Sequence, residues 1–436
     1  MINARIRGLI AVSVMLSTIM QVLDTTIANV ALPHMQGALS ASTEQVTWVL
    51  TSYIVATAIM TLPVGYVSRR FGRRRVFLFS VAGFTLASML CGQAGSLGEM
   101  VLWRVVQGIC GAALVPLSQS VLLDTFPVEQ HASAMSIWGT GVMLGPILGP
   151  TLGGWLTEYY SWRWVFYINL PIGIASFAGI YFFVRDTEPV KQRFDVAGFL
   201  LLALAVASLQ LLLDRGEHLK WFGSREIQGY LLVCLASLYF FFVHNLTGSQ
   251  RFFSPGLFRD RNFVSGVTFI FFLGVILLAT MVLLPPFLQV WKGYPVVTTG
   301  LVLVPRGVGT MVTMILAARL MRRFDPRAVI TTGMVLVGLS LQQMAGFTLQ
   351  VGAWPVVVSG FLQGLGLGLV FVPVSALAYA TLPAALRDEG TALFNLARNL
   401  GTSVGVSIVM AFLARNLWIN QQQLGARLAP EVLAGQ

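Results

Sequence analysis

Long apolar runs separated by short polar segments dominate the pattern of this 436-residue chain. Most runs hold roughly 20 predominantly apolar residues, which is the length an α-helix needs to cross the hydrocarbon core of a bilayer. The pattern therefore predicts an all-α membrane protein with thirteen helices and no inserted soluble domain. The predicted helices cover residues 9–33, 46–67, 76–94, 100–122, 132–156, 164–184, 196–213, 226–245, 263–290, 296–318, 328–348, 352–380 and 390–414.

The composition supports a chain that lies mostly in lipid. Hydrophobic residues make up 56% of it and charged residues only 10%, whereas soluble domains carry about 25% charged residues. Arg5 and Arg7 precede the first apolar run, as in a signal peptide. That run continues to Pro33, however, which is too long for a signal peptide, and no small-residue cleavage site follows. We expect the first membrane helix there.

The net charge of +11 would suggest a nucleic-acid partner in a soluble protein. In a membrane protein, Lys and Arg gather in cytoplasmic loops and orient the helices. With the N-terminus inside, most of the 28 basic residues fall in cytoplasmic segments. We therefore predict a multi-pass protein in the lipid bilayer, with a cytoplasmic N-terminus and no nucleic acid bound.

Cysteine and histidine usage predicts no metal site and no disulfide framework. The three cysteines, Cys91, Cys110 and Cys234, lie inside apolar runs without a C-x-x-C pair, and the four histidines are scattered. The sequence also lacks the G-x-x-x-x-G-K-[ST] loop that binds nucleoside triphosphates. We predict no metal and no cofactor, which leaves an ion gradient as the energy source for any transport.

Two short patterns recur at nearly one spacing. Arg69–Arg74 and Arg322–Arg327 are separated by 253 residues, and Gln107 and Gln363 by 256. The spacing favours two duplicated halves, with chance recurrence of Gly, Pro and Arg as the alternative. Transporters built from parallel halves bind substrate near the midplane between them.

This repeat divides the chain into three parts. We expect an N-terminal six-helix bundle in residues 1–195, two additional linker helices in 196–250 and a C-terminal bundle in 251–436. The second bundle is one helix short, because residues 415–436 are too polar to span a membrane. We expect the natural chain to continue into a fourteenth helix.

Asp24 is the acidic residue that lies deepest in a predicted helix. A carboxylate at bilayer depth costs several kcal/mol and is a functional candidate by default. Desolvation favours the protonated form of a carboxyl group, which suits a group that loads a proton on one side and releases it on the other. The alternative is a hydrogen-bonded Asp24 that only ties helices together.

Three arginines also fall within predicted helices: Arg104, Arg306 and Arg398. A buried Arg must pair or face water, and Asp24 is a candidate partner for Arg104. Alternatively, Arg104 lies near a helix end and extends its guanidinium to the interface. Arg306 and Arg398 pose the same question without an obvious acid nearby, so a structural role is equally open for them.

The predicted fifth helix carries a stripe of glycine and proline. Glycines repeated every four residues line one helix face and allow close approach of a neighbour, and prolines kink the helix. Ordinary tight packing and a moving interface both fit this stripe. Its members are Gly141, Gly145, Pro146, Gly149, Pro150, Gly153 and Gly154.

The arginine cluster after the second predicted helix, Arg69–Arg75, has three readings. Fixing the topology is the favoured one, binding to anionic lipid is another, and a role in gating stays open.

These motifs together resemble the major facilitator superfamily over essentially the whole chain, and within it the 14-helix drug:proton antiporters of the EmrB/QacA type. Leu23–Pro33 is similar to the first-helix motif of that group. Arg104, Gln107 and Gly108 are similar to a fourth-helix motif that the family associates with proton coupling. Gly141–Gly154 resembles the fifth-helix motif that marks antiporters.

The loop after the second helix also resembles the family, through Gly65, Arg69, Arg70, Gly72 and Arg73. One departure matters here: the family usually has an acid where this chain has Arg69. The family's contact from that acid to a helix therefore cannot be carried over. The segments Ser161–Gly173 and Leu209–Gly216 are similar to EmrB-like multidrug export permeases in particular.

The resemblance implies a proton-coupled multidrug efflux antiporter in the bacterial inner membrane that exports lipophilic or cationic compounds. Drug-like small molecules would be its cargo, with a periplasmic adaptor and an outer-membrane channel as partners. We expect Asp24 and Arg104 to couple protons, and Asp24, Asn29 and Gln107 to line a substrate cavity. The alternative is a proton-coupled transporter of one metabolite on the same fold. A membrane enzyme would need clustered His or carboxylates, which the sequence lacks.

Overall fold

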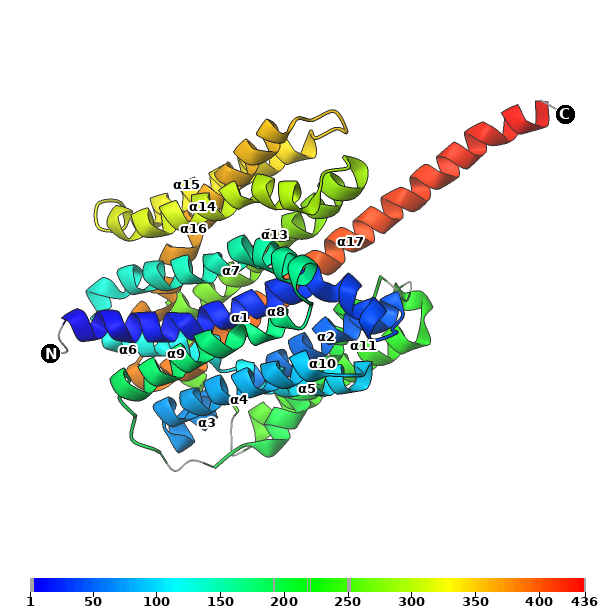
Figure 1. The fold of residues 1–436 in the computed structure, drawn as a ribbon. Coiled ribbons are helices and arrows are strands. Elements are labelled where there is room, and N and C mark those ends of the chain that lie inside the picture. The colour runs from blue at the N-terminus through cyan, green and yellow to red at the C-terminus, as the bar shows by residue number, and fades with distance from the viewer. Residues whose placement is uncertain (1–3, 191–192, 218, 220, 249–251, 435–436) are drawn as a thin grey trace.

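The computed structural model describes residues 4–190, 193–217, 219, 221–248 and 252–434 (Figure 1). The described residues form helices and loops, with no strand among them. The α-helices are α1 (Ala4–Ala38), α2 (Thr43–Thr61), α3 (Val64–Phe71), α4 (Arg73–Gln93), α5 (Leu97–Gly111), α6 (Leu114–Thr125), α7 (His131–Tyr159), α8 (Trp164–Tyr167), α9 (Asn169–Phe183), α10 (Val196–Arg215), α11 (Arg225–Thr247), α12 (Pro255–Arg259), α13 (Arg261–Pro286), α14 (Val296–Leu320), α15 (Pro326–Ala345), α16 (Ala353–Ala380) and α17 (Arg387–Ala434).

Every predicted apolar run corresponds to a helix or a pair of helices. Within the described residues, eleven helices are long and apolar enough to cross a membrane, or twelve if the bent pair α2–α3 counts as one. The remaining predicted run is α13, which continues as the π-helical turn Phe287–Trp291. Its described side chains divide into two shorter apolar stretches, Arg261–Ile276 and Val282–Trp291.

Some predicted helices are interrupted where the sequence disfavours a continuous helix. The run 46–67 bends by 58° between α2 and α3, at Pro63, whose ring cannot continue the hydrogen-bond pattern of an α-helix. Gly72 ends α3 with a φ of 93°, a conformation that favours glycine, and the chain turns there into α4. The short α3 therefore projects its arginines toward one end of the molecule.

The last helix corrects the prediction for the C-terminal segment. The expected helix 390–414 and its polar tail form one continuous helix, α17, of 48 residues. At 1.5 Å per residue it is about 72 Å long, more than twice the ~30 Å hydrocarbon core, and its end extends beyond the other helices (Figure 1). The tail is too polar to lie in lipid, but its Gln, Leu, Ala and Arg residues favour a helix in water.

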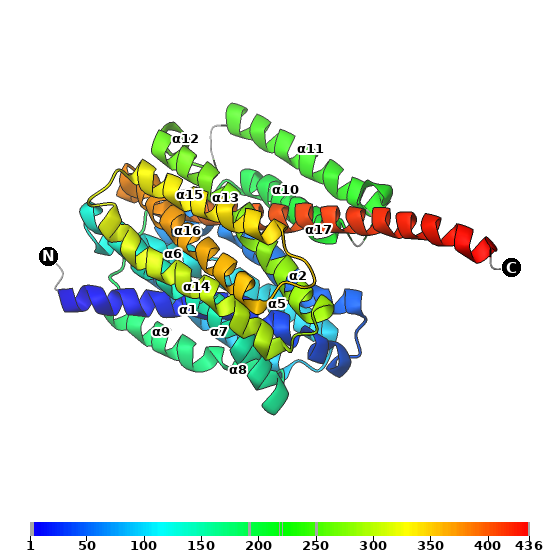
Figure 2. The same cartoon turned by 90° about the horizontal axis from the view of Figure 1, so that it is seen from above.

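The helices pack as a bundle whose interior holds the polar residues. α1 packs against α7 and α9, α13 against α17, and α14 against α16, while α10 and α11 form a pair that reaches α2 and α17. Figure 2 shows α11 at the edge of the bundle. Large apolar side chains such as Phe79, Phe182 and Leu246 point outward, as expected for a surface covered by lipid tails.

Candidate functional site

Asp24 lies in the middle of α1, fully buried, and accepts hydrogen bonds from three residues on two other helices, α5 and α9. Its Oδ2 accepts from a guanidinium nitrogen of Arg104 at 2.7 Å. Its Oδ1 accepts from the side-chain amides of Gln107 at 2.9 Å and Asn169 at 2.8 Å. Because all three partners donate, the arrangement fits the ionised carboxylate.

Arg104 makes several contacts besides its ion pair with Asp24. Its Nε donates to the carbonyl of Val49 at 2.9 Å, and a terminal nitrogen also donates to Gln107 at 2.8 Å. The guanidinium lies over the ring of Tyr53, 4.3 Å from its centroid. The side chain is fully buried, so the alternative in which Arg104 extends to the membrane interface is wrong.

Asn169, at the start of α9, is a member of this buried cluster that the sequence did not single out. Besides Asp24, it donates to the hydroxyl of Ser88 at 2.9 Å. An uncharged Asn in an apolar run gives a weaker signal than a charge does, because its burial costs less. We refer to Asp24, Arg104, Gln107 and Asn169 as the Asp24 cluster.

A cavity of about 1000 Å³ lies beside the Asp24 cluster. Arg104 and Asn29 contribute to its wall, but Asp24 and Gln107 do not. Asp24 and Gln107 lie behind this wall in the present conformation, and their part in a substrate cavity stays a prediction. Arg104 is the member of the cluster that reaches both the cavity and the carboxylate.

The cavity opens where α1 ends and α2 begins. Pro33 and Gln45 at this rim are exposed. Asp214, in the last turn of α10, also lines the cavity, is exposed and accepts a hydrogen bond from Thr51. The arginine-rich end of α3 lies at the other end of the molecule, near the start of α1 (Figure 1).

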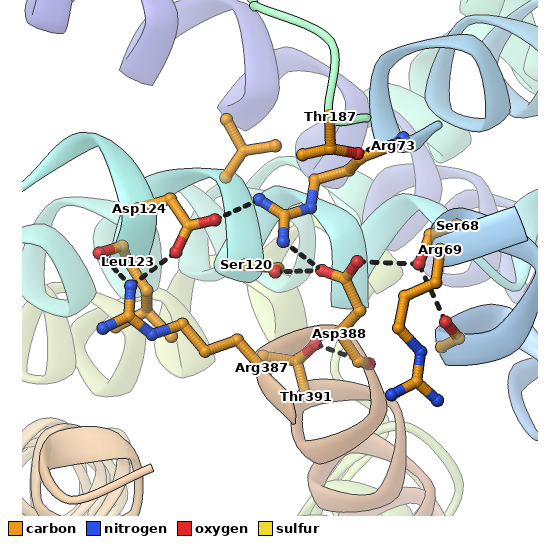
Figure 3. A network of polar contacts seen from close by, with 12 residues as sticks. Ser68, Arg69, Arg73, Ser120, Leu123, Asp124, Thr187, Arg387, Asp388 and Thr391 are labelled. Carbon is orange, nitrogen blue, oxygen red and sulfur yellow. Dashed lines mark hydrogen bonds and ion pairs between the residues drawn. The ribbon is translucent and has the colours of Figure 1, made fainter. Parts of the chain in front are cut away.

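At that opposite end a network of ion pairs joins α3, α4 and α6 to α17, and Figure 3 shows the part of it around Asp124 and Asp388. Arg69, on α3, pairs with Glu389 on α17 at 2.9 Å. Arg73, at the start of α4, pairs with Asp388 on α17 at 2.8 Å and with Asp124 on α6. Arg387 also pairs with Asp124. We call these six residues the latch.

Hydroxyl groups complete the latch around its buried acids. Ser68 donates to Asp388 at 2.7 Å, and Ser120 donates to the other oxygen of that carboxylate. Ser254, between α11 and α12, donates through its hydroxyl to Glu389 at 2.9 Å. The segment that precedes α12 therefore also contacts the latch.

The predicted loop-motif residues divide between the latch and its support. A Cβ on Gly65 would lie 2.7 Å from the Cα of Glu389, so only glycine lets α3 approach α17 this closely. Gly72 provides the turn between Arg69 and Arg73, while Arg70 lies half-buried on α3. Arg69 does contact a helix despite replacing an acid, because here the acids come from α17.

The glycine stripe of α7 faces α1 on both sides of Asp24. A Cβ on Gly145 would lie 2.5 Å from Val22, and one on Gly149 would lie 2.2 Å from the hydroxyl of Thr26. Gly141 and Gly153 meet α1 in the same way, and Pro146 lines the cavity. Gly154 has nothing within 4 Å. The side chain of Pro150 lies outside the described residues.

The two remaining helix arginines lie in different surroundings. Arg306, on α14, is buried, lines the cavity and donates to the hydroxyl of Thr280 at 2.9 Å. Arg398, on α17, is half-buried. A Cβ on Gly274 of α13 would lie 2.5 Å from the carbonyl oxygen of Arg398, so α13 and α17 are in close backbone contact there.

Comparison with known proteins gives the same family over most of the chain. The family model of the Major Facilitator Superfamily matches residues 14–406. The chain is 34% identical to the multidrug export protein EmrB of Escherichia coli K12, over 95% of this chain and 81% of that protein. It is 33% identical to the fatty acid resistance protein FarB of Neisseria gonorrhoeae, over 97% and 83%.

Solved structures agree on the fold. The proton:xylose symporter XylE superposes with a TM-score of 0.67 at 17% identity, over 96% of this chain and 91% of that one. The human organic anion transporter MFSD10 gives 0.62 at 15%, over 94% and 93%. At such identities only the fold is comparable. Sequence, helical architecture and structural likeness agree, and the chain belongs to the major facilitator superfamily of multi-pass membrane transporters.

Proposed function

We propose that the chain is a proton-coupled multidrug efflux antiporter of the bacterial inner membrane that exports lipophilic or cationic compounds. The observation that carries this proposal is the buried Asp24 cluster, one of whose members, Arg104, also lines a large cavity. The names of these relatives, multidrug export and fatty acid resistance proteins, support drug-like small molecules as cargo.

Proton coupling follows from what a proton would do at Asp24. The ionised carboxylate holds Arg104 through a fully buried ion pair. A proton on Oδ2 would neutralise the carboxylate and remove the electrostatic attraction, which is strong in a low-dielectric interior. Arg104 would then be freed from its partner at the cavity wall. Binding of a proton to Asp24 would therefore also change the position of Arg104 in the cavity wall.

Alternating access follows from the two ends of the molecule. With the N-terminus in the cytoplasm, as the distribution of arginines favours, the cavity opens to the periplasm and the latch closes the cytoplasmic end. The bundle of residues 1–195 would rock against that of 251–436, with the helices of 196–250 between them. A periplasmic adaptor and an outer-membrane channel are part of this proposal, and the proton gradient serves in place of a cofactor.

The test uses inside-out vesicles with an acidic lumen and a lipophilic cationic dye outside. We expect gradient-driven uptake by the wild type and a loss of at least about tenfold in Asp24→Asn, in line with the loss of one essential proton-transfer group. Asp325→Asn is the matched control, because this exposed residue caps α15 through the backbone of Arg327, and Asn caps equally well.

Uptake by Asp24→Asn at the wild-type rate would move proton coupling away from this residue. Failure of the wild type to take up this dye or a broader panel of drugs would instead favour the transport of one metabolite on the same fold.

A further inference from the structure

The second half of the chain holds a polar cluster in which two positions correspond to Asp24 and Gln107 of the Asp24 cluster. Thr280 on α13 follows Asp24 by 256 residues, and Gln363 on α16 follows Gln107 by the same 256. The contact between the two positions is kept: Thr280 donates to Gln363 at 3.2 Å, as Gln107 donates to Asp24 at 2.9 Å. The repeat thus places a hydroxyl where the first half has its carboxylate.

The neighbouring glycines, Gly108 and Gly364, also pack in similar ways in the two halves. A Cβ on Gly108 of α5 would lie 2.6 Å from the carbonyl oxygen of Tyr53 on α2. A Cβ on Gly364 of α16 would lie 2.0 Å from the carbonyl oxygen of Arg306 on α14. Arg306 therefore occupies the position that Tyr53 has in the first half.

The guanidinium has changed helices between the two halves. The position that matches Arg104 is Gly360, 256 residues later, and a Cβ there would lie 3.7 Å from the Cβ of Arg306. Arg306, on α14, donates to Thr280 on α13 at 2.9 Å. The second cluster therefore has a guanidinium, a hydroxyl and an amide, but Thr280 has replaced the titratable carboxylate.

This second cluster is built to hold an acceptor. Arg306 and Thr280 both line the cavity and are 4% and 7% exposed. Gln363 is fully buried, and its amide nitrogen has no hydrogen-bond partner among the described residues. A buried donor without a partner is costly unless a ligand or water satisfies it. Arg306 stays charged at any physiological pH, so its charge does not change with the proton gradient.

Negative and positive residues of the cavity wall lie at different depths. Among the described residues that line the cavity, the one with a carboxylate is Asp214, which is exposed at the rim. Arg104 and Arg306, in contrast, are buried. A cation would meet its counter-charge at the rim, and an oxyanion would meet it deeper in the wall.

We propose that Arg306, with Thr280, is the specificity-determining anchor of the cavity and holds the oxyanion of an amphipathic cargo, such as a carboxylate on an apolar body. This inference rests on the proposed transport function and narrows its cargo class. The cargo's apolar body lies against the apolar part of the cavity, and its carboxylate accepts from the guanidinium.

The test measures equilibrium binding to the purified full-length chain in lipid nanodiscs, with no proton gradient. The probes are a dansyl-labelled fatty acid and the primary amide of the same molecule. We expect Arg306→Gln to weaken binding of the carboxylate by at least about tenfold, the value of a hydrogen bond to a charged group. Binding of the amide should change by less than about threefold.

Two further variants make the result decisive. Arg306→Lys keeps the positive charge and should restore part of the carboxylate affinity. Arg319→Gln is the matched control, because this residue is exposed in the last turn of the same helix, α14. Amide binding shows that each variant is folded.

The inference is overturned if Arg306→Gln leaves carboxylate binding unchanged or weakens both probes equally. These outcomes are separate from those of the Asp24→Asn vesicle assay. If Asp24→Asn loses dye uptake while Arg306→Gln still binds the carboxylate probe as the wild type does, only the anchor is rejected. If Arg306→Gln weakens carboxylate binding while Asp24→Asn takes up the dye at the wild-type rate, only the proton mechanism is rejected.

Discussion

Among single residues, Asp24 and Arg104 depend on each other. Their ion pair is fully buried, and removing one partner of such a pair leaves an uncompensated charge in a low-dielectric interior. The two amides that also contact Asp24, from Gln107 and Asn169, stabilise the carboxylate but cannot replace a full positive charge.

We expect Arg104→Gln to lower the free energy of unfolding by about 3–5 kcal/mol, the cost of breaking a buried pair. The double variant Asp24→Asn/Arg104→Gln should recover most of this loss, because neither side chain then carries a charge. Thermal unfolding of the purified protein in detergent measures both. A double variant as unstable as the single one would mean that packing, and not charge, accounts for the loss.

The residues that the sequence identified and those that it missed differ in a physical way. Asp24 and Arg104 stood out because a charge inside an apolar run is rare and costly. Asp388 and Glu389 did not, because acids in the first turn of a helix are ordinary partners of its dipole. That both are buried in the latch depends on the approach of α3, which no local pattern encodes.

Among the helices, the α1–α7 contact fixes the position of Asp24. The glycines of α7 bring its backbone against Val22 and Thr26, on either side of the carboxylate. Thr26 in turn donates to the carbonyl of Gly145 at 3.2 Å. The stripe, which the sequence left open between tight packing and a moving interface, is thus closely packed in this conformation.

We expect Gly149→Ala to destabilise the protein by about 1–3 kcal/mol, the usual cost of overpacking, because its Cβ would overlap the hydroxyl of Thr26. Gly154→Ala provides the control on the same helix. Its Cβ would meet nothing within 4 Å, so this variant should be as stable as the wild type or slightly more stable. Equal melting temperatures for the two variants would contradict close packing at Gly149.

The positions of the helices could be predicted from apolar run length, since lipid imposes that length on every spanning segment. The interruptions near Pro63 and the extension of α17 could not be placed in the same way. The prediction for residues 415–436 used polarity, which decides whether a segment enters lipid but not whether it is helical.

For the molecule as a whole, the latch joins parts of the chain that are more than 300 residues apart, as in the pair of Arg69 and Glu389. Two of its arginines come from α3 and α4, while its third arginine and two of its acids come from α17. The family resemblance alone, which expects an acid at position 69, gave no reason to predict this contact.

We expect Arg69→Glu to separate the helices at the end of the molecule that the latch joins, because it would place a carboxylate at position 69 against that of Glu389. The exchange Arg69→Glu/Glu389→Arg should close it again by restoring opposite charges. Spin labels at Phe71 and Ala384, both exposed, would report a longer distance for the single variant and a wild-type distance for the exchange. If the distance in Arg69→Glu stays that of the wild type, the pair does not hold this end together.

Continuity of α17 has a mechanical consequence. The same helix begins in the latch at Asp388 and contributes Val406 to the cavity wall, about 27 Å farther along at 1.5 Å per residue. As a rigid lever pivoting at the latch, it would carry Val406 sideways by about 5 Å for a tilt of about 10°. Breaking the ion pairs of the latch at one end of the molecule would then move the cavity wall at the other end directly, through the rigid helix.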